Sequence, residues 1–175
     1  LRRLRRRLYP RIHGRTLELG VGTGVNLPLY PPQTELVAVD LRAAMLRRAT
    51  LRRRPAQALY VQADAEALPF AEAAFEHVTT SLLLCSVRDP ARALGEIQRV
   101  LRPGGCLLML EHVRGEGWLM RHLTDWLDRP WYRMNGSCHL NRDTHEAVRA
   151  SGLEIVSARR HVLGIVQVIH ARRVA

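Results

Sequence analysis

Short apolar runs alternate along the chain with longer stretches of helical composition. The apolar runs predict strands at Thr16–Leu19, Leu36–Val39, Ala58–Gln62, within Ala73–Leu84, at Cys106–Leu110, and at Leu153–Ala158 and Gly164–Ala171. Helices are predicted at Ala43–Arg54, Ala91–Leu101 and Asp143–Ser151, and a short one after the first strand, ended by Pro28 and the Pro31-Pro32 pair. Strands that alternate with helices predict an α/β fold, in which helices cover both faces of one sheet.

Two segments stand out from this alternation. Arg102–Gly105 predicts a sharp turn before Cys106–Leu110, a wholly apolar run that is typical of a central strand buried on both faces. Residues 113–141 contain all three tryptophans, Trp118, Trp126 and Trp131. We interpret Val113–Asn141 as an insertion that caps a substrate pocket. The alternative is that these aromatic residues pack a surface helix onto the core, because tryptophan is usually mostly buried.

The length of 175 residues suits one domain, residues 1–175, and is short for two. Within residues 1–15, Leu1, Leu4 and Leu8 recur at helical spacing among arginines. This segment is therefore expected to form either a lid helix or a helix on an anionic membrane surface. No segment approaches the roughly 18 apolar residues of a spanning helix, and no secretory signal pattern occurs, so we expect a cytoplasmic protein.

The formal net charge of +11 could attract phosphate, and all 27 Lys and Arg residues are arginine. The arginines are spread along the chain, apart from clusters at Arg2–Arg15 and Arg52–Arg54, and no aromatic residues interleave with them as in a single-strand platform. This disfavours nucleic acid as the substrate.

The three cysteines, Cys85, Cys106 and Cys138, are odd in number and follow no disulfide or zinc spacing. The eight histidines are scattered and form no His-Glu-x-x-His pattern. We therefore predict no metal, and a reducing compartment suits the cysteines.

The glycine-rich segment Glu18–Gly24 carries the first candidate chemistry. Gly20, Gly22 and Gly24 would let the backbone approach a ligand closely in a strand-to-helix turn. A dinucleotide fingerprint needs a further glycine where this chain has Val25. The charge of Glu18 would repel a pyrophosphate but attract the amino and sulfonium groups of S-adenosylmethionine, directly or through water. The loop therefore favours a cationic ligand over an anionic one.

Two aspartates follow the next two predicted strands. Asp40 ends the second strand, where a carboxylate can accept hydrogen bonds from both ribose hydroxyls, as one does in NAD enzymes as well. Asp64 follows the third strand and could accept from an adenine amino group, with the backbone amide of Ala65 beside it. The alternative for Asp64 is to cap the N-terminus of a helix.

Five segments resemble class I S-adenosylmethionine-dependent methyltransferases in order and spacing. They are Glu18–Gly24, Val39-Asp40, Asp64–Phe70, Phe75–Val78 and Arg99–Gly105. The resemblance runs from about Thr16 to the C-terminus, with one departure at Glu76, where the family commonly has aspartate. It implies a Rossmann-like, doubly wound sheet of seven mostly parallel strands with helices on both faces and an antiparallel last strand.

The resemblance also implies a cofactor, S-adenosylmethionine, which leaves as S-adenosylhomocysteine. The residues expected to bind it are Glu18, Gly20, Gly22, Gly24, Asn26, Asp40, Leu41, Met45, Asp64, Ala65, Glu66, Ser81 and Leu82.

A narrower likeness concerns the acceptor. Thr80–Val87, Leu110–Val113, Asp128–Trp131 and Gly136–Thr144 are similar to the thiol methyltransferase branch of the methyltransferase-like proteins and its bacterial relatives. This likeness implies a small-molecule acceptor, an alkyl thiol. Quinone and phospholipid methyltransferases share the general motifs and remain alternatives, as do an RNA or protein methyltransferase and a cofactor-binding module without turnover.

Methyl transfer from a sulfonium is an in-line displacement that depends mostly on an aligned acceptor. Ligands of open α/β sheets gather beyond the carboxyl ends of the strands, so we expect the acceptor beside the fourth and fifth strands. His112 is the candidate base or orienting group there, unless it only bonds nearby backbone. Cys85 could instead be a small buried hydrophobe, and Asn141 could cap the next helix. The residues expected near the acceptor are Cys85, Glu111, Trp118, Trp126, Trp131 and Asn141.

Overall fold

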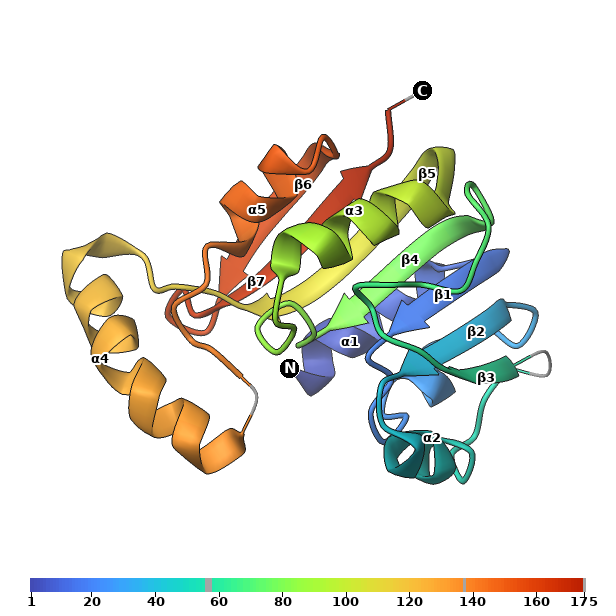
Figure 1. Cartoon of the computed structure of the whole chain (residues 1–175), viewed down its shortest axis with the longest axis horizontal. Coiled ribbons are helices and arrows are strands. Elements are labelled where there is room, and N and C mark those ends of the chain that lie inside the picture. The colour runs from blue at the N-terminus through green and yellow to red at the C-terminus, as the bar shows by residue number, and fades with distance from the viewer. Residues whose placement is uncertain (56–57, 137, 175) are drawn as a thin grey trace.

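The computed structural model describes residues 1–55, 58–136 and 138–174, arranged around one seven-stranded sheet (Figure 1). Ser137, within the segment Gly136–Thr144, and Ala175, at the end of the predicted domain, lie outside the described residues. The strands are β1 (Arg15–Leu19), β2 (Glu35–Asp40), β3 (Ala58–Gln62), β4 (Phe75–Ser81), β5 (Leu101–His112), β6 (Glu154–His161) and β7 (Val166–Arg172). The helices are α1 (Arg2–Leu8), α2 (Ala43–Ala49), α3 (Pro90–Val100), α4 (Gly117–Asn135) and α5 (Thr144–Ala150), with 3-10 helices η1 (Tyr9–Arg11) and η2 (Leu27–Leu29).

The strand order is β3-β2-β1-β4-β5-β7-β6. The first five strands pair in parallel, whereas β7 runs antiparallel to both β5 and β6. This confirms the predicted doubly wound sheet with an antiparallel last strand. The order reverses at β1, whose neighbours β2 and β4 lie on opposite sides of it, and the carboxyl ends of all five parallel strands meet at one edge. Such a switch point is where open α/β sheets bind ligands.

The sharp turn predicted at Arg102–Gly105 is wrong, because these residues belong to β5. Phe75 of β4 pairs with Leu101, but His77 pairs with Cys106, so β5 contains extra residues and forms an irregular bulge. Gly104 has a φ of +74°, and a Cβ on Gly105 would lie 2.8 Å from the Arg102 carbonyl oxygen. The glycines thus permit a bulge within the strand where the sequence suggested a turn.

The helices early in the chain are shorter than predicted. Only the 3-10 helix η2 follows the glycine loop, because Pro28 lies in its first turn and Pro31 directly follows its C-cap, Tyr30. Helix α2 ends at Ala49, before the expected limit at Arg54. Helices α3 and α5 agree closely with their predicted ranges, and the side chains of Asp89 and Asp143 cap their N-termini.

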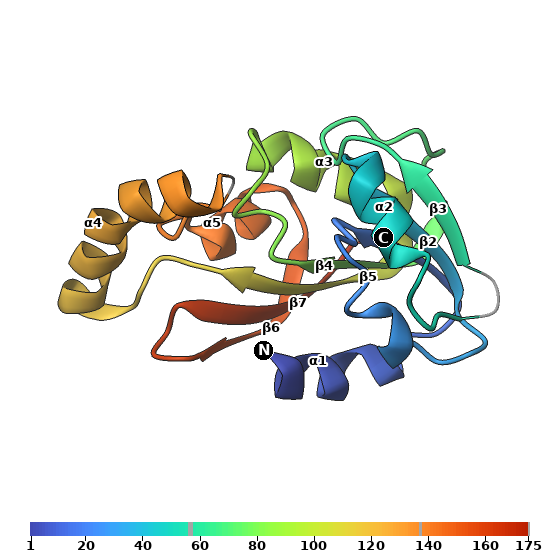
Figure 2. The ribbon, with the colours of Figure 1, turned by 90° about the horizontal axis from the view of Figure 1, so that it is seen from below.

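Two apolar cores lie on opposite faces of the sheet. Figure 2 shows α1 on one side of the sheet and α3 and α5 on the other. The first core is made with α3 and α5 and includes Ile97 and Val148. The second contains Tyr9 and Leu27 from the 3-10 helices and Leu46 from α2, and Leu4 and Leu8 of α1 pack partly buried against it. Helices therefore cover both faces, as predicted from the alternating pattern.

Residues 113–141 contain helix α4, which projects beyond the end of the sheet (Figure 1). Asp128 holds the chain after α4 against the helix, since its carboxylate accepts from Leu140 N at 2.7 Å and bonds His139 Nδ1 at 3.0 Å. Among the described residues, no helix combines the length and the apolar character needed to cross a membrane.

Gly24 and Gly104 offer a matched test of the packing around the glycine loop, with φ values of +75° and +74°. A Cβ on Gly24 would lie 2.8 Å from Leu27 Cδ1 and 3.0 Å from Ala49 Cα, whereas nothing lies within 4 Å of a Cβ on Gly104. Gly104→Ala should cost only backbone strain, about 1 kcal/mol. Gly24→Ala should cost about 1–3 kcal/mol more because the loop and α2 must separate. Urea unfolding of both variants measures the loss of unfolding free energy. An equal loss in Gly24→Ala and Gly104→Ala would contradict tight packing around Gly24.

Candidate functional site

A cavity of about 630 Å³ opens at the carboxyl edge of the parallel strands. Its volume is in the range of small-molecule and cofactor sites. The segments that follow β1, β2, β3 and β4 form its wall: Gly20, Gly22, Val39, Asp40, Leu41, Arg42, Met45, Ala63, Asp64, Ala65, Glu66, Leu82, Leu83, Ser86, Val87 and Arg88. The cavity therefore lies at the switch point of the sheet.

Asp40 holds the glycine loop in place. Gly22 N donates to Asp40 Oδ2 at 2.8 Å, and Arg42 N donates to Oδ1 at 2.9 Å. A Cβ on Gly20 would lie 2.9 Å from Leu83 Cδ1, so glycine lets the loop approach the wall after β4. A carboxylate has about four acceptor sites, which leaves Asp40 able to accept from hydroxyl groups in the cavity as well.

Asp64 and Glu66 organise the adjoining wall. Asp64 Oδ1 accepts from Glu66 N at 2.9 Å and so stabilises a turn, not the helix N-terminus of the alternative interpretation. Glu66 Oε1 accepts from Arg88 N at 2.8 Å and Asp89 N at 3.1 Å, which ties this turn to the segment before α3. Both side chains also face the cavity.

The structure brings most of the predicted cofactor residues together on this cavity wall. They are Gly20, Gly22, Asp40, Leu41, Met45, Asp64, Ala65, Glu66 and Leu82. The other wall residues were not predicted to bind the cofactor: Val39, Arg42 and Ala63, and, in the loop after β4, Leu83, Ser86, Val87 and Arg88. Leu82 begins this loop with a φ of +61°, a left-handed conformation that is rare for leucine and frequent at ligand sites.

Glu18, Gly24, Asn26 and Ser81, also expected to bind the cofactor, are not among the residues that line this cavity. Gly24 packs against α2, as described above. Ser81 Oγ accepts from Arg5 of α1, at 3.1 Å from Nη2 and 3.3 Å from Nε.

Glu18 and Asn26 form a buried polar network. Asn26 Nδ2 lies 2.7 Å from Glu18 Oε1 and 3.0 Å from Tyr9 Oη, and donates to both. Glu18 Oε2 has no hydrogen-bond partner among the residues that the structure describes. Burial raises the pKa of Glu18 to about 7, although the bond from Asn26 opposes this. The buried carboxyl therefore contacts Asn26 and is not part of the cavity wall.

Glu111 was predicted to contact the acceptor, but it holds a loop instead. Its side chain is fully buried, and its Oε1 accepts from Thr80 Oγ1 at 2.8 Å and from Leu83 N at 3.0 Å. Burial raises the pKa of Glu111 to about 7, and hydrogen bonds from Thr80 and from the backbone after β4 limit that rise. Glu111 thus fixes the wall that begins at Leu82.

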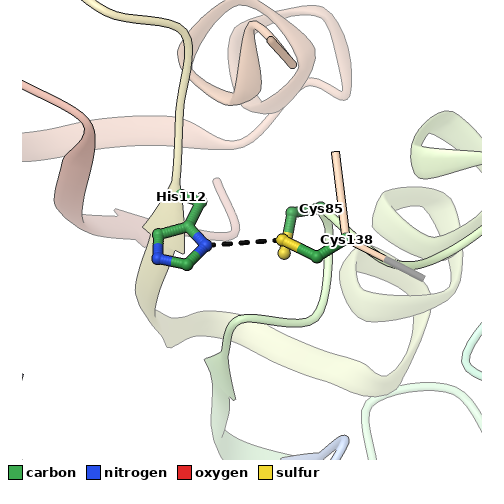
Figure 3. Close-up of side chains that lie close together, drawn as sticks. All are labelled: Cys85, His112 and Cys138. Atoms are coloured by element: carbon green, nitrogen blue, oxygen red, sulfur yellow. Dashed lines mark hydrogen bonds between the residues drawn. The ribbon is translucent and has the colours of Figure 1, made fainter. Parts of the chain in front are cut away.

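Cys85, His112 and Cys138 converge beside this loop (Figure 3). His112 Nδ1 lies 3.4 Å from Cys138 Sγ, and all three ligand atoms lie within 4.8 Å of one another. Hydrogen bonds from Cys85 and His112 lower the pKa of Cys138, while the bond to Cys138 and burial raise the pKa of Cys85. His112 therefore contacts a thiol as well as lying at the predicted strand end.

The structure places the three tryptophans of the expected cap in different surroundings. Trp131 lies edge-on to His112, with ring centroids 6.4 Å apart. Trp118 and Trp126 are about three-quarters exposed, at 75% and 74%, so they cannot roof a pocket or pack onto the core in this structure. Asn141 is exposed and lines neither the large cavity nor the smaller one beside α5, and Asp143, not Asn141, caps α5. Trp131 alone of the three thus lies beside His112.

The chain matches a family model described as "Methyltransferase domain" over residues 17–109. It is 35% identical over 136 residues to thiol S-methyltransferase TMT1B of Rattus norvegicus, across 73% of this chain and 55% of the relative. It is also 38% identical over 111 residues to demethylmenaquinone methyltransferase of Roseiflexus sp. strain RS-1, across 62% of this chain and 47% of the relative. The chain spans about half the length of these curated relatives.

A solved methyltransferase in complex with the Haloferax volcanii activator Trm112 has a similar structure. The TM-score is 0.80 at 16% identity, over 99% of this chain and 89% of that chain. At this identity the likeness concerns the fold alone.

Glu18 should make the stability of the protein depend on pH. Its folded pKa of about 7 exceeds the ordinary value of 4.5, so the folded state binds the proton more tightly. Its contribution to stability is complete below pH 4.5 and is lost as pH rises through about 7. Between pH 4.5 and pH 8, the free energy of unfolding of Glu18→Gln should therefore rise by about 3 kcal/mol relative to that of the unsubstituted chain. Urea unfolding across this range measures the difference, and parallel profiles would contradict the buried titration.

Proposed function

Because the chain belongs to the class I S-adenosylmethionine-dependent methyltransferases, we propose that it transfers the methyl group to a small-molecule thiol. The observation that carries this proposal is the contact of His112 with the Cys138 thiol, with Cys85 close by, while Glu111 is already engaged in holding the loop. A thiol acceptor, with an ordinary pKa near 8.5, needs much less help from a base than an alcohol or a carbon acceptor does.

The cavity suits S-adenosylmethionine. No side chain occupies the space in front of Gly22, where the nearest atom to a Cβ would be Gly20 O at 4.0 Å. Asp40 would accept from the ribose hydroxyls, and Asp64 from the adenine amino group, with the Ala65 amide beside it. The negative charge of ionised Glu18 would favour the cationic part of the ligand. When bound, this cofactor supplies an electrophilic methyl group on a sulfonium sulfur.

The protein's part in the reaction is mainly alignment. Leu82, Leu83 and Ser86 line the cofactor cavity on either side of Cys85 in the sequence, and Glu111 holds this loop through Leu83 N. His112 would orient the acceptor or remove its proton, so that its sulfur can attack in line. Trp131 would exclude water on the far side of His112.

A quinone acceptor is the second candidate, favoured by the 38% identity to a demethylmenaquinone methyltransferase. A phospholipid acceptor, an RNA acceptor and a cofactor-binding module without turnover remain as further outcomes of the test. The exposed tryptophans of α4 would suit an apolar acceptor as well as an apolar partner.

A methyl-transfer screen with labelled S-adenosylmethionine tests the acceptor. Alkyl thiols, quinols, phospholipid vesicles and bulk tRNA are assayed side by side, and product must form with thiols at rates that rise as pH approaches the thiol pKa. Activity confined to quinols, vesicles or tRNA would contradict the thiol proposal. Firm cofactor binding without turnover on any acceptor would favour the binding module.

We also propose that α1, within the predicted segment 1–15, closes the cofactor site. Arg5 of α1 donates hydrogen bonds to Ser81, which directly precedes the cavity-lining Leu82. Leu4 and Leu8, on the apolar face of α1, pack against the core of the protein. This supports the lid interpretation over a helix whose leucines enter a membrane surface.

Arg5→Ala should weaken cofactor binding about tenfold, because the charged hydrogen bonds to Ser81 are lost and α1 opens more often. Arg3→Ala, an exposed position on the same helix, is the matched control and should leave affinity unchanged. Calorimetric titration with S-adenosylhomocysteine compares the three proteins. Equal affinity for Arg5→Ala and the unsubstituted chain would refute the lid.

A further inference from the structure

Cys85, His112 and Cys138 form a ligand cluster that the sequence spacing did not indicate. Cys85 lies in the loop after β4, His112 ends β5, and Cys138 follows α4, so three separate elements supply one group (Figure 3). A tetrahedral Zn²⁺ with bonds of about 2.0 Å to nitrogen and 2.3 Å to sulfur holds its ligand atoms roughly 3.5–3.8 Å apart. The observed 3.4 Å between His112 Nδ1 and Cys138 Sγ lies close to that spacing, and all three ligand atoms lie within 4.8 Å.

Contacts around the cluster fix each of its members. His139 N donates to the Cys85 carbonyl oxygen at 2.8 Å, which joins the segment of Cys138 to the loop of Cys85. Asp128 holds that same segment through His139 and Leu140. Trp131 packs edge-on against the His112 ring. Such outer contacts are what orient ligands in metal sites.

We propose that these three side chains bind Zn²⁺ and leave a fourth position for the sulfur of the acceptor thiol. Among the described residues, the cluster contains no fourth histidine, cysteine or carboxylate. Structural zinc sites have four protein ligands, whereas catalytic sites have three and an open position. The set of two thiolates and one imidazole therefore has the composition of an open site, placed next to cavity-lining Ser86.

This proposal rests on the thiol acceptor proposed above and explains how that acceptor would be held and activated. The thiol RSH loses its proton to solvent as its sulfur binds Zn²⁺, so the bound form is a thiolate. The thiolate sulfur then attacks the methyl carbon. A new sulfur–carbon bond forms, the sulfonium–carbon bond breaks, and its electron pair returns to the sulfonium sulfur. The products are RSCH₃, S-adenosylhomocysteine and one proton, with no change of metal oxidation state.

A disulfide between Cys85 and Cys138 is the competing use of the same thiols. It would require the two sulfurs to approach to about 2.05 Å and would remove both thiolate ligands. Metal binding and disulfide formation are therefore mutually exclusive and can be distinguished by a thiol count with and without reductant.

Metal content and the spectrum of a Co²⁺ derivative test the site directly. The full chain, kept reduced with a phosphine, is dialysed against Zn²⁺ or Co²⁺ and compared with Cys138→Ser, His112→Gln and Cys106→Ser. Cys106 is exposed and lies outside the cluster, so Cys106→Ser is the matched control. We expect one metal per chain with thiolate-to-cobalt charge transfer in the unsubstituted protein and the control. We expect the metal affinity of Cys138→Ser and His112→Gln to be at least about 100-fold weaker, because losing a metal ligand costs more affinity than losing a contact that only orients a ligand.

Adding an alkyl thiol to the Co²⁺ protein should increase the thiolate-to-cobalt charge transfer, and removing metal with a chelator should abolish thiol methylation while S-adenosylhomocysteine still binds. Equal metal affinity in all four proteins, a disulfide that persists under the reductant, or an unchanged Co²⁺ spectrum with the thiol would each overturn the zinc proposal.

The two proposals can fail separately. Thiol methylation at full rate by metal-free protein would overturn the zinc site and leave the thiol acceptor standing. Metal binding by the cluster, with methylation of quinols only, would overturn both the thiol acceptor and the role of Zn²⁺ in binding it.

Discussion

The buried carboxyl of Glu111 is the constraint on which both sides of the site depend. It lies near the end of β5 and accepts from Thr80 in β4 and from Leu83 in the following loop. That loop supplies Leu82 and Leu83 to the cofactor cavity and Cys85 to the thiol cluster. Because a buried carboxyl is costly unless it is hydrogen-bonded, the two bonds to Glu111 Oε1 hold the loop in place. The positions of Leu83 and Cys85 are therefore set from inside the protein core.

The parallel arrangement of the first five strands explains why the remaining parts of the site gather together. Asp40 follows β2 and receives the Gly22 amide, so the second strand directly positions the loop after the first. Glu66, after β3, bonds the backbone just before α3. Each acidic side chain thus ties the end of one strand to the loop of another, and the cavity wall results from these cross-connections.

Much of this architecture follows from local sequence signals. The periodicity of the apolar residues, the apolar runs and the spacing of the glycines are sufficient to predict the strands. They also predict Gly20, Gly22, Asp40 and Asp64 as residues of the site. The Pro-Gly-Gly segment forms a bulge in β5, where the sequence predicted a turn. The bulge depends on the pairing of β5 with Phe75 and His77 of β4, and no local sequence pattern indicates that pairing. Glu111 and Glu18 look like site residues in sequence, but which face of a strand is buried is decided by packing. Cys85, His112 and Cys138 are far apart in sequence and meet only through the path of α4, so their spacing carried no signal.

We expect the cavity at the ends of β1, β2, β3 and β4 to bind S-adenosylmethionine. Calorimetric titration of the full chain with S-adenosylmethionine, S-adenosylhomocysteine and NAD tests this binding, with Asp40→Ala measured in parallel. We predict one site per chain for the first two ligands, none for NAD, and affinity about 10- to 100-fold weaker in Asp40→Ala. Binding of NAD without S-adenosylmethionine, or unchanged affinity in Asp40→Ala, would contradict it.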